Sequence, residues 1–554
     1  MSKQKLRIGL LINSHAIPSW AYKLVENINS SDHSQIILVV KRKSGQSQKQ
    51  SIFKTLWENR NVLLFILYAK FEKQFFKLHP DAFATKDLKP IINCPEIEVI
   101  PKETKFSDRI LDEDLEKIEK HDIDIFIRFG FRILRGGILS IAKYGIWSYH
   151  HGNNEVNRGG PAGVWQVLEN WDETGSILQV LNEDLDGGLV IYESSSVTDY
   201  ISVNRNKNNY YWKTLSFMTR RLKELHDVGA ETFFAKYKEK NTDPQFYYNR
   251  LYRTPTNWQL IKGVTSNYLR SIKIRIKNIF IREQWILLFK MEKSPKISQS
   301  FFRFKRILPP KDRFWADPFV LQRDDKYYLF IEELLYSNNR GMISVMEIDE
   351  QGNHTVPEVV LEKEYHLSYP QIIEDQGELY MLPETKGNKT IELYKCIDFP
   401  KKWELEKVLF DDIIAVDSTI FKHDNKYWLF TNVKENEGAS AYDELFLFYS
   451  DSLLGAWTPH PLNPIVSDVK YARPAGNIFI YNDKIFRPSQ NCSKHYGYGM
   501  QIREIVTLTE TDYEERQVQS IYPNWSKDLI STHTLNNSGK LTVIDALVKR
   551  RKYF

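Results

Sequence analysis

From about residue 310 onward, one pattern recurs five times along the chain. Each copy has a polar residue, an apolar strand, a turn rich in Asp, Asn or Gly, and a second apolar strand. The copies span residues 316–330, 368–382, 416–430, 472–486 and 531–544. They recur at roughly 50 to 60 residues, which is the period of a four-stranded propeller blade. The repeat therefore predicts an all-β five-bladed propeller over residues 284–554.

A propeller brings the beginnings of its innermost strands together around one axis. Here this places five polar side chains at the axis, namely Asp317, Tyr369, Asp417, Arg473 and His533. The ends of the second strands add Glu332 or Glu333, Glu384, Gln490 and Asp545. From both sets we predict a sugar pocket made by Asp317, Glu333, Glu384, Asp417, Arg473 and His533. The run Trp285–Phe289 is expected to supply the missing outer strand that closes the ring.

Strand and helix patterns alternate in the first half of the chain. Apolar runs typical of buried strands lie at 6–12, 35–40, 97–100, 124–128 and 145–149. Their alternation with helical segments predicts a doubly wound, Rossmann-type α/β domain over residues 1–205. A Gly-x-Gly-x-x-Gly motif is missing, so a dinucleotide cofactor is not supported. Ligands of such sheets bind beyond the carboxyl ends of strands, and His150 directly follows the last of these runs.

Residues 206–283 change character and predict a helical linker region. Within it, the basic segment 268–282 places Leu269, Ile272 and Ile276 on one helical stripe, yet it also alternates with period two. Helix and strand therefore stay open. A basic amphipathic segment is compatible with peripheral contact to an anionic membrane surface. The alternative, which we favour, is a linker helix between domains with a solvated basic face.

Composition describes a multidomain globular protein. The 554 residues are 42% hydrophobic and 27% charged, and the net charge of +5 argues only weakly for an anionic partner. Three distant cysteines form neither a metal-binding spacing nor a disulfide framework, so we expect no metal and a reducing compartment. The N-terminus lacks the features of a signal peptide, and the apolar run at 62–69 is too short to span a membrane. A cytoplasmic protein, membrane-associated at most, is the resulting prediction.

The stretch from Tyr149 to Gly188 resembles the signature region of the folate-dependent formyltransferases. That family has an Asn-x-His-Pro-Ser stretch, an Arg-Gly, a Thr-Gly and a Leu-Asp-x-Gly. The matching residues occur here in the same order, as His150, Arg158-Gly159, Thr174-Gly175 and Leu185-Asp186-Gly187-Gly188. The resemblance covers roughly residues 5–200 and implies a formyltransferase-like α/β fold.

The resemblance also implies roles for individual residues. His150 matches the catalytic histidine, and Asp186 matches the aspartate that orients it. The segment 129–137 occupies the place of a loop that contacts folate, which implies 10-formyltetrahydrofolate as formyl donor, held by Phe129, Gly130, Arg158 and Gly159. One position departs from the family, because Ser148 stands where an Asn supplies an oxyanion donor. Loss of such a donor costs about 10²–10³ in rate, so Ser148 is a catalytic candidate and also the point at which activity is in question.

The propeller half resembles the N-terminal domain of glucosamine inositolphosphorylceramide transferases and, more distantly, the arabinanase-like glycosidases. The matching stretches include "RFWADPF", "VDSTIF", "ARPAGNIF" and "RPSQNCS". In the glycosidases two Asp and one Glu form the catalytic group, and Asp317, Asp417 and Glu384 could occupy comparable places. Glycoside hydrolysis needs such paired carboxylates, whereas a sugar-binding pocket needs no chemistry from them. Arg473 and His533 nearby indicate an anionic partner, such as a phosphate.

These observations lead to one main hypothesis and two alternatives. The main hypothesis is formyl transfer from 10-formyltetrahydrofolate to the amine of a nucleotide- or lipid-linked amino sugar in surface polysaccharide biosynthesis, with the propeller binding the glycan. The first alternative is a carbohydrate-binding protein whose formyltransferase fold has lost catalysis. The second is a propeller-borne glycosyl transferase or hydrolase. A nucleic-acid function is not expected, because the net charge is slight.

Overall fold

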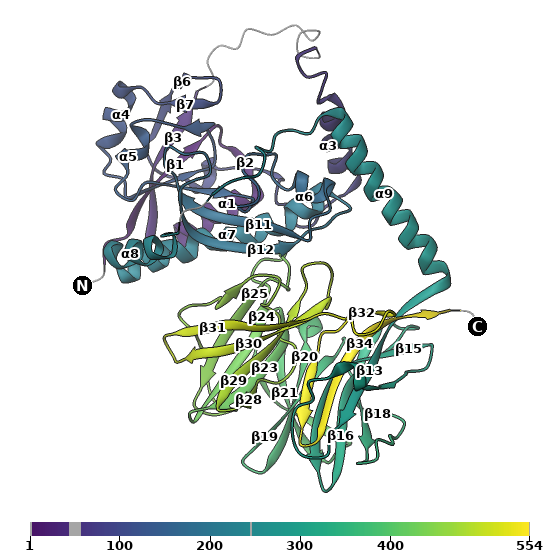
Figure 1. Cartoon of the computed structure of the whole chain (residues 1–554). Helices are drawn as coiled ribbons and strands as arrows, with labels where there is room; N and C mark the ends of the chain where they lie inside the picture. The colour runs from purple at the N-terminus through teal and green to yellow at the C-terminus, as the bar shows by residue number, and fades with distance from the viewer. Residues whose placement is uncertain (1–2, 44–56, 244–245, 553–554) are drawn as a thin grey trace. The chain divides into compact units, whose positions relative to one another are not determined.

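The structure is a computed structural model that describes residues 3–43, 57–243 and 246–552. The chain divides into two compact units (Figure 1). The first holds Met1–Arg270 with Asn436–Ser440, and the second holds Ser271–Glu435 with Ala441–Phe554. The sequence predicts three parts, 1–205, 206–283 and 284–554, so the structure differs in assigning most of the middle region to the first unit.

The first unit contains a seven-stranded sheet with strand order β12-β11-β10-β8-β1-β3-β5. Strands β10, β8, β1, β3 and β5 run parallel, and β11 and β12 complete the sheet as antiparallel strands. Their bounds are β1 Leu6–Ile12, β3 Ser34–Arg42, β5 Glu96–Val99, β8 Ile125–Arg128, β10 Ile146–His150, β11 Glu173–Val180 and β12 Leu189–Val197. The strand order reverses direction between β1 and β8, and the loops that follow these two strands meet there, because Phe131 N donates to Asn13 Oδ1 over 2.7 Å.

Helices pack on this sheet through apolar faces. The largest is α7, Val203–Val228, which buries Leu215, Phe217 and Met218 in one cluster with strand β1 and helix α1, Ser19–Ser30. This burial is the physical reason why residues 206–228 belong to the first unit and do not form a linker. Helices α4 Asp112–Glu119, α5 Ile138–Ile141, α6 Val164–Leu168 and α8 Ala230–Lys240 also belong to this unit.

Two further helices have large exposed apolar faces. They are α3, Leu63–Phe75, and α9, Asn257–Phe280, so the segment that left helix and strand open is helical as far as Phe280. Strand β13 begins at the next residue. Among the described residues, the structure contains no helix with the length and apolar character needed to cross a membrane.

The second unit is a β-propeller with five antiparallel sheets (Figure 1). Blade 1 has β15 Arg313–Arg323, β16 Lys326–Leu335, β17 Arg340–Ile348 and β18 Glu358–Leu361; blade 2 has β19 Ser368–Asp375, β20 Glu378–Thr385, β21 Thr390–Asp398 and β22 Lys402–Phe410; blade 3 has β23 Ala415–His423, β24 Lys426–Val433, β25 Glu444–Ser450 and β26 Thr458–Pro459; blade 4 has β28 Phe479–Tyr481, β29 Lys484–Asn491, β30 Gly499–Leu508 and β31 Tyr513–Ile521. The β-propeller prediction is thereby confirmed.

The hairpins inside the blades depend on their turn residues. Asp324-Asp325, Asp424-Asn425 and Asn482-Asp483 all have positive φ at both positions, between 47° and 60°. Asp and Asn tolerate this region, and two consecutive positive φ values define the type I′ turn that suits a tight hairpin. The polar pairs in the sequence repeat therefore fix the register of the first and second strands in three blades.

The fifth blade joins the two ends of the propeller sequence. Strand β13, Ile281–Met291, pairs with β34, Leu541–Arg551, along their full length. Strand β33, Leu535–Ser538, lies on the other side of β34, and β14, Lys305–Ile307, forms the outer edge beyond β13. The run Trp285–Phe289 thus closes the ring as an interior strand of the blade, whereas the sequence led us to expect an outer strand.

Candidate functional site

The axis-facing positions of the first three blades share one backbone conformation. Asp317, Tyr369 and Asp417 have φ of 48°, 49° and 50°, and each lies at a break in the pairing register of its strand. A β-bulge of this kind re-aims a side chain, and a positive φ on a non-glycine residue stores strain. The same bulge in three blades turns these side chains to a common centre, as the repeat predicted.

One cluster at this centre is built around His533. Its Nδ1 lies 2.6 Å from Asp545 Oδ2, and its Nε2 lies 3.8 Å from Asp317 Oδ1. Asp545 also accepts the backbone N–H groups of His533 and Thr534, over 2.9 and 3.1 Å. Burial opposes a charge on the imidazole, but the two carboxylates outweigh it and raise the pKa of His533 to about 9. His533 is therefore a buried cation at neutral pH.

Asp317, His533 and Asp545 could each offer one ligand atom to a metal ion, and these three atoms lie within 4.8 Å of one another. A metal-bound imidazole must give up a proton, and the raised pKa of His533 works against this. The ion pair between the imidazolium and Asp545 accounts for the position of His533 without an ion. Burial raises the pKa of Asp317 well above its usual value, although the His533 cation opposes the shift.

A second cluster joins blades 2, 3 and 4. Arg473 donates from Nε to Asp417 Oδ2 over 2.5 Å and from Nη2 to Asp417 Oδ1 over 3.0 Å. Gln490 Nε2 donates to the same carboxylate over 2.6 Å. Glu384 extends the cluster, with Oε2 3.7 Å from Arg473 Nη2 and Oε1 3.3 Å from Lys386 Nζ. This fork-to-fork geometry is the strongest form of the Arg–carboxylate pair.

The two carboxyl groups of this cluster titrate in different ranges. Burial raises the pKa of Asp417 to about 6, against the attraction of Arg473. Burial also acts on Glu384, but Lys386 and Arg473 lower its pKa below the usual value. The pair thus holds one carboxyl group that can carry a proton near neutral pH beside one that stays ionised, which is the division of roles found in acid–base catalysis.

The structure assigns the two neighbouring glutamates of blade 1 to different places. Glu333 accepts from Arg313 Nη1 over 2.8 Å, from Trp315 Nε1 over 3.3 Å and from Ser344 Oγ over 2.6 Å, so it links the strands of its own blade. Glu332 contributes to the electrostatic environment of Asp317 and lies 3.2 Å from His366 Nε2. Successive residues of a strand point to opposite faces, so Glu332 belongs to the axis cluster, where the sequence led us to place Glu333.

Two aromatic residues of the axis cluster were missed from the sequence. The guanidinium of Arg473 lies over the rings of Tyr442 and Tyr496, 5.3 and 4.9 Å from their centroids. Tyr496 also meets His533 edge-on at 5.2 Å, and Trp285 stacks on His533 at 4.1 Å. Tyr442 and Tyr496 fall in loops outside the repeated pattern, so no periodic signal marks them.

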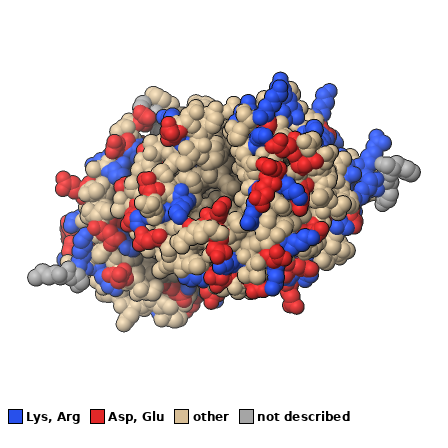
Figure 2. All heavy atoms as spheres, turned by 90° about the horizontal axis from the view of Figure 1, so that it is seen from below, with Lys and Arg blue, Asp and Glu red and all other residues tan. Residues whose placement is uncertain are grey.

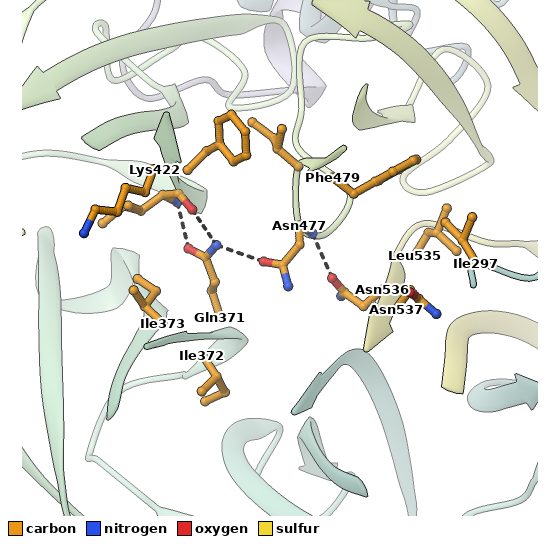
Figure 3. A pocket seen from close by; sticks show the side chains of 13 residues that line it. Ile297, Gln371, Ile372, Ile373, Lys422, Asn477, Phe479, Leu535, Asn536 and Asn537 are labelled. Carbon is orange, nitrogen blue, oxygen red and sulfur yellow. Dashed lines mark hydrogen bonds between the residues drawn. The ribbon is translucent and has the colours of Figure 1, made fainter. Parts of the chain in front are cut away.

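Farther along the innermost strands, a cavity of about 270 Å³ is lined by a chain of amides (Figure 3). Gln371 Nε2 donates to Asn477 Oδ1 over 2.9 Å, and Asn477 N donates to Asn536 Oδ1 over 2.8 Å. Apolar side chains complete the lining, among them Ile297, Ile373, Phe421, Phe479 and Leu535. Gln371 stands two residues after Tyr369, so an alignment of the repeat could have found it.

One face of the molecule has a hollow with charges of both signs around it (Figure 2). Acidic and basic side chains are interspersed on this face, and neither sign dominates it.

The predicted residues of the first unit also come together. His150 Nδ1 lies 3.4 Å from Asp186 Oδ1, and its Nε2 lies 2.9 Å from the carbonyl oxygen of Asn157. Asp186, with φ of 53°, accepts the backbone N–H of Gly159 over 3.1 Å. Both ring nitrogens of His150 thus face acceptors. The ring therefore ties the loop that follows β10 to Asp186 and to the carbonyl of Asn157.

The remaining predicted residues of this unit also have structural partners. Ser148 is 2% exposed, and its Oγ accepts from Arg128 Nη1 over 3.2 Å. Phe129 packs edge-on against Trp20. A side chain at Gly130 would meet the backbone of Asn13 at 2.5 Å. Arg158 Nε donates to the carbonyl of Asn154 over 2.9 Å, and its guanidinium lies over Tyr247.

The side chain of His151 packs against three tyrosine rings, and the residue is only partly exposed. Its ring centroid is 3.7 Å from that of Tyr211, 5.3 Å from Tyr210 and 5.7 Å from Tyr149. Burial lowers the pKa of His151 well below its usual value, so this ring is neutral. The two adjacent histidines therefore have different environments.

Comparisons with known proteins bear on the second unit above all. Residues 308–536 match the family model described as glucosamine inositolphosphorylceramide transferase 1, N-terminal. Proteins of that name from Oryza sativa subsp. japonica and Arabidopsis thaliana are 36% and 35% identical over 205 and 208 residues, which is 36% and 37% of the chain. The chain covers 27% of the length of each of these relatives. A native arabinanase from Bacillus subtilis aligns over 42% of the chain and 92% of its own, at 12% identity and a TM-score of 0.30.

The first unit has one partial match among curated proteins. The methionyl-tRNA formyltransferase of Prochlorococcus marinus is 36% identical over 78 residues, which is 14% of the chain and 23% of that enzyme. The stronger and longer matches carry the name of a different transferase. The prediction that the chain is a formyltransferase is therefore wrong. The folate cofactor stays a prediction that no comparison tests.

Proposed function

We propose that the chain acts in the biosynthesis of a glycan or glycolipid and that its propeller binds a sugar of the substrate at the axis cluster. The similarity of residues 308–536 to the N-terminal part of transferases named for a glycosylated ceramide supports the substrate class. The axis cluster supplies what sugar recognition needs, namely buried carboxylates, an arginine and tyrosine rings.

One observation carries this proposal. Glu384 Oε2 is buried, and no described residue donates a hydrogen bond to it in the structure. Asp417 donates one to Glu384 only when Asp417 is protonated. A buried carboxylate oxygen without a hydrogen bond costs free energy, even with the guanidinium of Arg473 3.7 Å away. A sugar hydroxyl that donates to Glu384 removes this cost, while the neighbouring Arg473 favours a hydroxyl or phosphate oxygen on the same sugar.

A binding experiment tests the proposal. The full chain is titrated by calorimetry with glucosamine, inositol phosphate and short glycans that contain them, and the same series is run with Glu384→Gln. We expect binding to weaken by about tenfold or more, because a charge-assisted hydrogen bond contributes roughly 1.5–3 kcal/mol. Glu378→Gln, a change at an exposed position of the same strand, serves as the matched control. Equal affinity of Glu384→Gln and wild type for every ligand refutes the assignment of this site.

A second candidate function is chemistry at a glycosidic bond. The separated pKa values of Asp417 and Glu384 favour it, because one group can act as acid while the other stays ionised. Release of phenol from aryl glycosides, measured for wild type and Asp417→Asn, tests it. Turnover that disappears in Asp417→Asn supports bond cleavage, and absence of turnover for sugars that bind limits the propeller to recognition.

For the first unit we infer a formyltransferase-like α/β domain that has kept its fold without its chemistry. The 78-residue match and the strand order support the relationship. In this proposal His150 and Asp186 hold the loop 150–159 in place. The cytoplasmic location stays a prediction.

A further inference from the structure

Helix α9 exposes a continuous apolar stripe. Trp258, Ile261, Tyr268, Leu269, Ile272, Ile276, Ile279 and Phe280 are each between 45% and 73% exposed, and we call this set the α9 stripe. At 3.6 residues per turn these positions fall within about 120° of the helix circumference. The buried residues of α9, Leu260, Gly263 and Asn267, lie on the opposite side. The protein therefore packs one face of this helix and leaves its most apolar face exposed.

The charges on α9 have one sign. The helix contains five basic residues and no Asp or Glu, the basic residues being Lys262, Arg270, Lys273, Arg275 and Lys277. At 100° per residue, Arg275 borders the α9 stripe on one side, and Lys262 and Lys273 border it on the other. Lys262, Lys273 and Arg275 are exposed and form no ion pair with any residue that the structure describes. This part of the helix thus combines apolar surface with unbalanced positive charge.

A second exposed apolar face accompanies α9. Helix α3 packs against the first half of α9 through Phe65 and Tyr68, which join the cluster that contains Leu260 and Val264. On α3, Leu64, Leu67, Phe71 and Phe75 are 38% to 66% exposed. Large apolar patches on a protein surface mark an interaction site.

We propose that α9 lies flat on an anionic phospholipid membrane, with the α9 stripe among the upper acyl chains and its lysines and arginines against the lipid phosphates. A wide apolar face bordered by basic side chains is the pattern of helices that bind in the membrane interface. The absence of acidic residues on α9 matches a negative surface, and the five cations make burial across the hydrocarbon core costly. Membrane binding does not depend on the sugar site of the propeller and can be tested without it.

Vesicle flotation with the full chain tests the proposal. The protein is mixed with phosphatidylcholine vesicles in which about one lipid in three is phosphatidylserine, and with vesicles of phosphatidylcholine alone. We expect binding to the anionic vesicles that weakens as salt is raised, because screening reduces the attraction of the basic residues. Each cation at the surface contributes about fivefold to the partition coefficient, so Lys273→Glu with Arg275→Glu is expected to reduce it by at least about 25-fold.

Substitution of the α9 stripe separates the apolar from the charge contribution. Leu269→Gln, Ile272→Gln and Ile276→Gln together keep helix propensity, because Gln forms helices at least as well as Ile. We expect this triple variant to lose at least tenfold in vesicle binding, by about the transfer free energy of exposed side chains. The control removes equally exposed apolar residues elsewhere, with Ile397→Gln, Ile480→Gln and Val518→Gln, and should bind like wild type.

Two outcomes overturn the proposal. One is a wild-type protein that stays with the buffer and not with the anionic vesicles at low salt. The other is a stripe variant that binds as well as wild type. A third result would assign the α9 stripe to an interface between copies of the chain. In that case light scattering shows a dimer for wild type and a monomer for the stripe variant, and neither protein binds vesicles. Failure of the sugar titrations leaves these results unchanged, because the vesicles contain no sugar.

Discussion

His533 and Asp545 form a buried ion pair at the propeller axis, with Nδ1 2.6 Å from Oδ2 and both side chains at most 2% exposed. Asp317 faces the other ring nitrogen at 3.8 Å. The arrangement connects β34, the last strand of the fifth blade, to β15, the first strand of blade 1. His533 thus links a strand of the blade that closes the ring to the carboxyl group of blade 1 at the axis.

The propeller should lose stability as pH rises from about 6.5 to 9. An unfolded histidine has a pKa near 6.5, and the folded pKa of His533 is raised to about 9. A raised pKa stabilises the fold fully below the unfolded value, and this contribution disappears as pH passes through the folded value. The expected loss in unfolding free energy is about 3 kcal/mol, and urea denaturation at several pH values measures it. His533→Gln should flatten the profile, and His354→Gln, an exposed position, should leave it unchanged.

Tryptophan fluorescence gives a second measure of the same titration. Trp285 stacks on His533 at 4.1 Å, and a protonated imidazole quenches an indole in contact with it. The emission of native protein should therefore increase with a midpoint near pH 9, and Trp285→Phe should remove that component. A midpoint near pH 6.5 in native protein would contradict the ion-pair assignment.

Arg473→Met should destabilise the propeller by about 3–5 kcal/mol, because it leaves the buried carboxylate of Asp417 without its cation. The loss should be smaller at pH 5 than at pH 8, since the pKa of Asp417 is raised to about 6 and a protonated carboxyl group needs no partner. Urea midpoints at the two pH values measure this difference. Arg303→Met, at an exposed position, is the matched control. A loss for Arg473→Met that does not depend on pH would mean that Asp417 is not the group left unpaired.

His150→Ala should loosen the loop 150–159 and leave the sheet intact. The substitution removes the contacts to Asp186 and to the carbonyl of Asn157, and loss of buried hydrogen bonds costs about 1–3 kcal/mol. Limited proteolysis should cut this loop faster, while far-ultraviolet circular dichroism stays unchanged. His121→Ala, a half-buried histidine outside the loop, should be cut at the wild-type rate. Equal rates for His150→Ala and wild type would remove the proposed holding role.

The repeat carries most of the information about the propeller. The Asp-Asp and Asp-Asn turns and the alternation of apolar residues depend on local backbone preferences, so they predict the blades directly. The choice between Glu332 and Glu333 depends on which face of β16 meets the axis, and a bulge at Asp317 in the paired strand shifts that register. Tyr442 and Tyr496 reach the axis from irregular loops, which leave no periodic trace in the sequence.

The middle region shows a different limit of sequence reasoning. The sequence predicts that residues 206–228 belong to a linker, because polar residues alternate with the apolar positions that α7 buries. Its burial against β1 and α1 depends on contacts between residues about 200 positions apart. For α9, in contrast, the spacing of apolar residues in the sequence already indicates the α9 stripe. The sequence does not decide between helix and strand, and the structure shows a helix.

Leu287→Ala tests how strongly β13 closes the ring. Leu287 is 1% exposed and packs in the cluster that contains Leu329 from blade 1 and Leu541 from β34. A large-to-small change in such a core costs about 2–5 kcal/mol. Because β13 and β34 pair along their full length, we expect hydrogen exchange to accelerate in both strands together. Leu405→Ala, on the outer strand of blade 2 and 50% exposed, should cost less than about 1 kcal/mol. Similar small losses for the two variants would mean that the pairing of β13 with β34 adds little to the propeller, and that the ring is held by its other blade contacts.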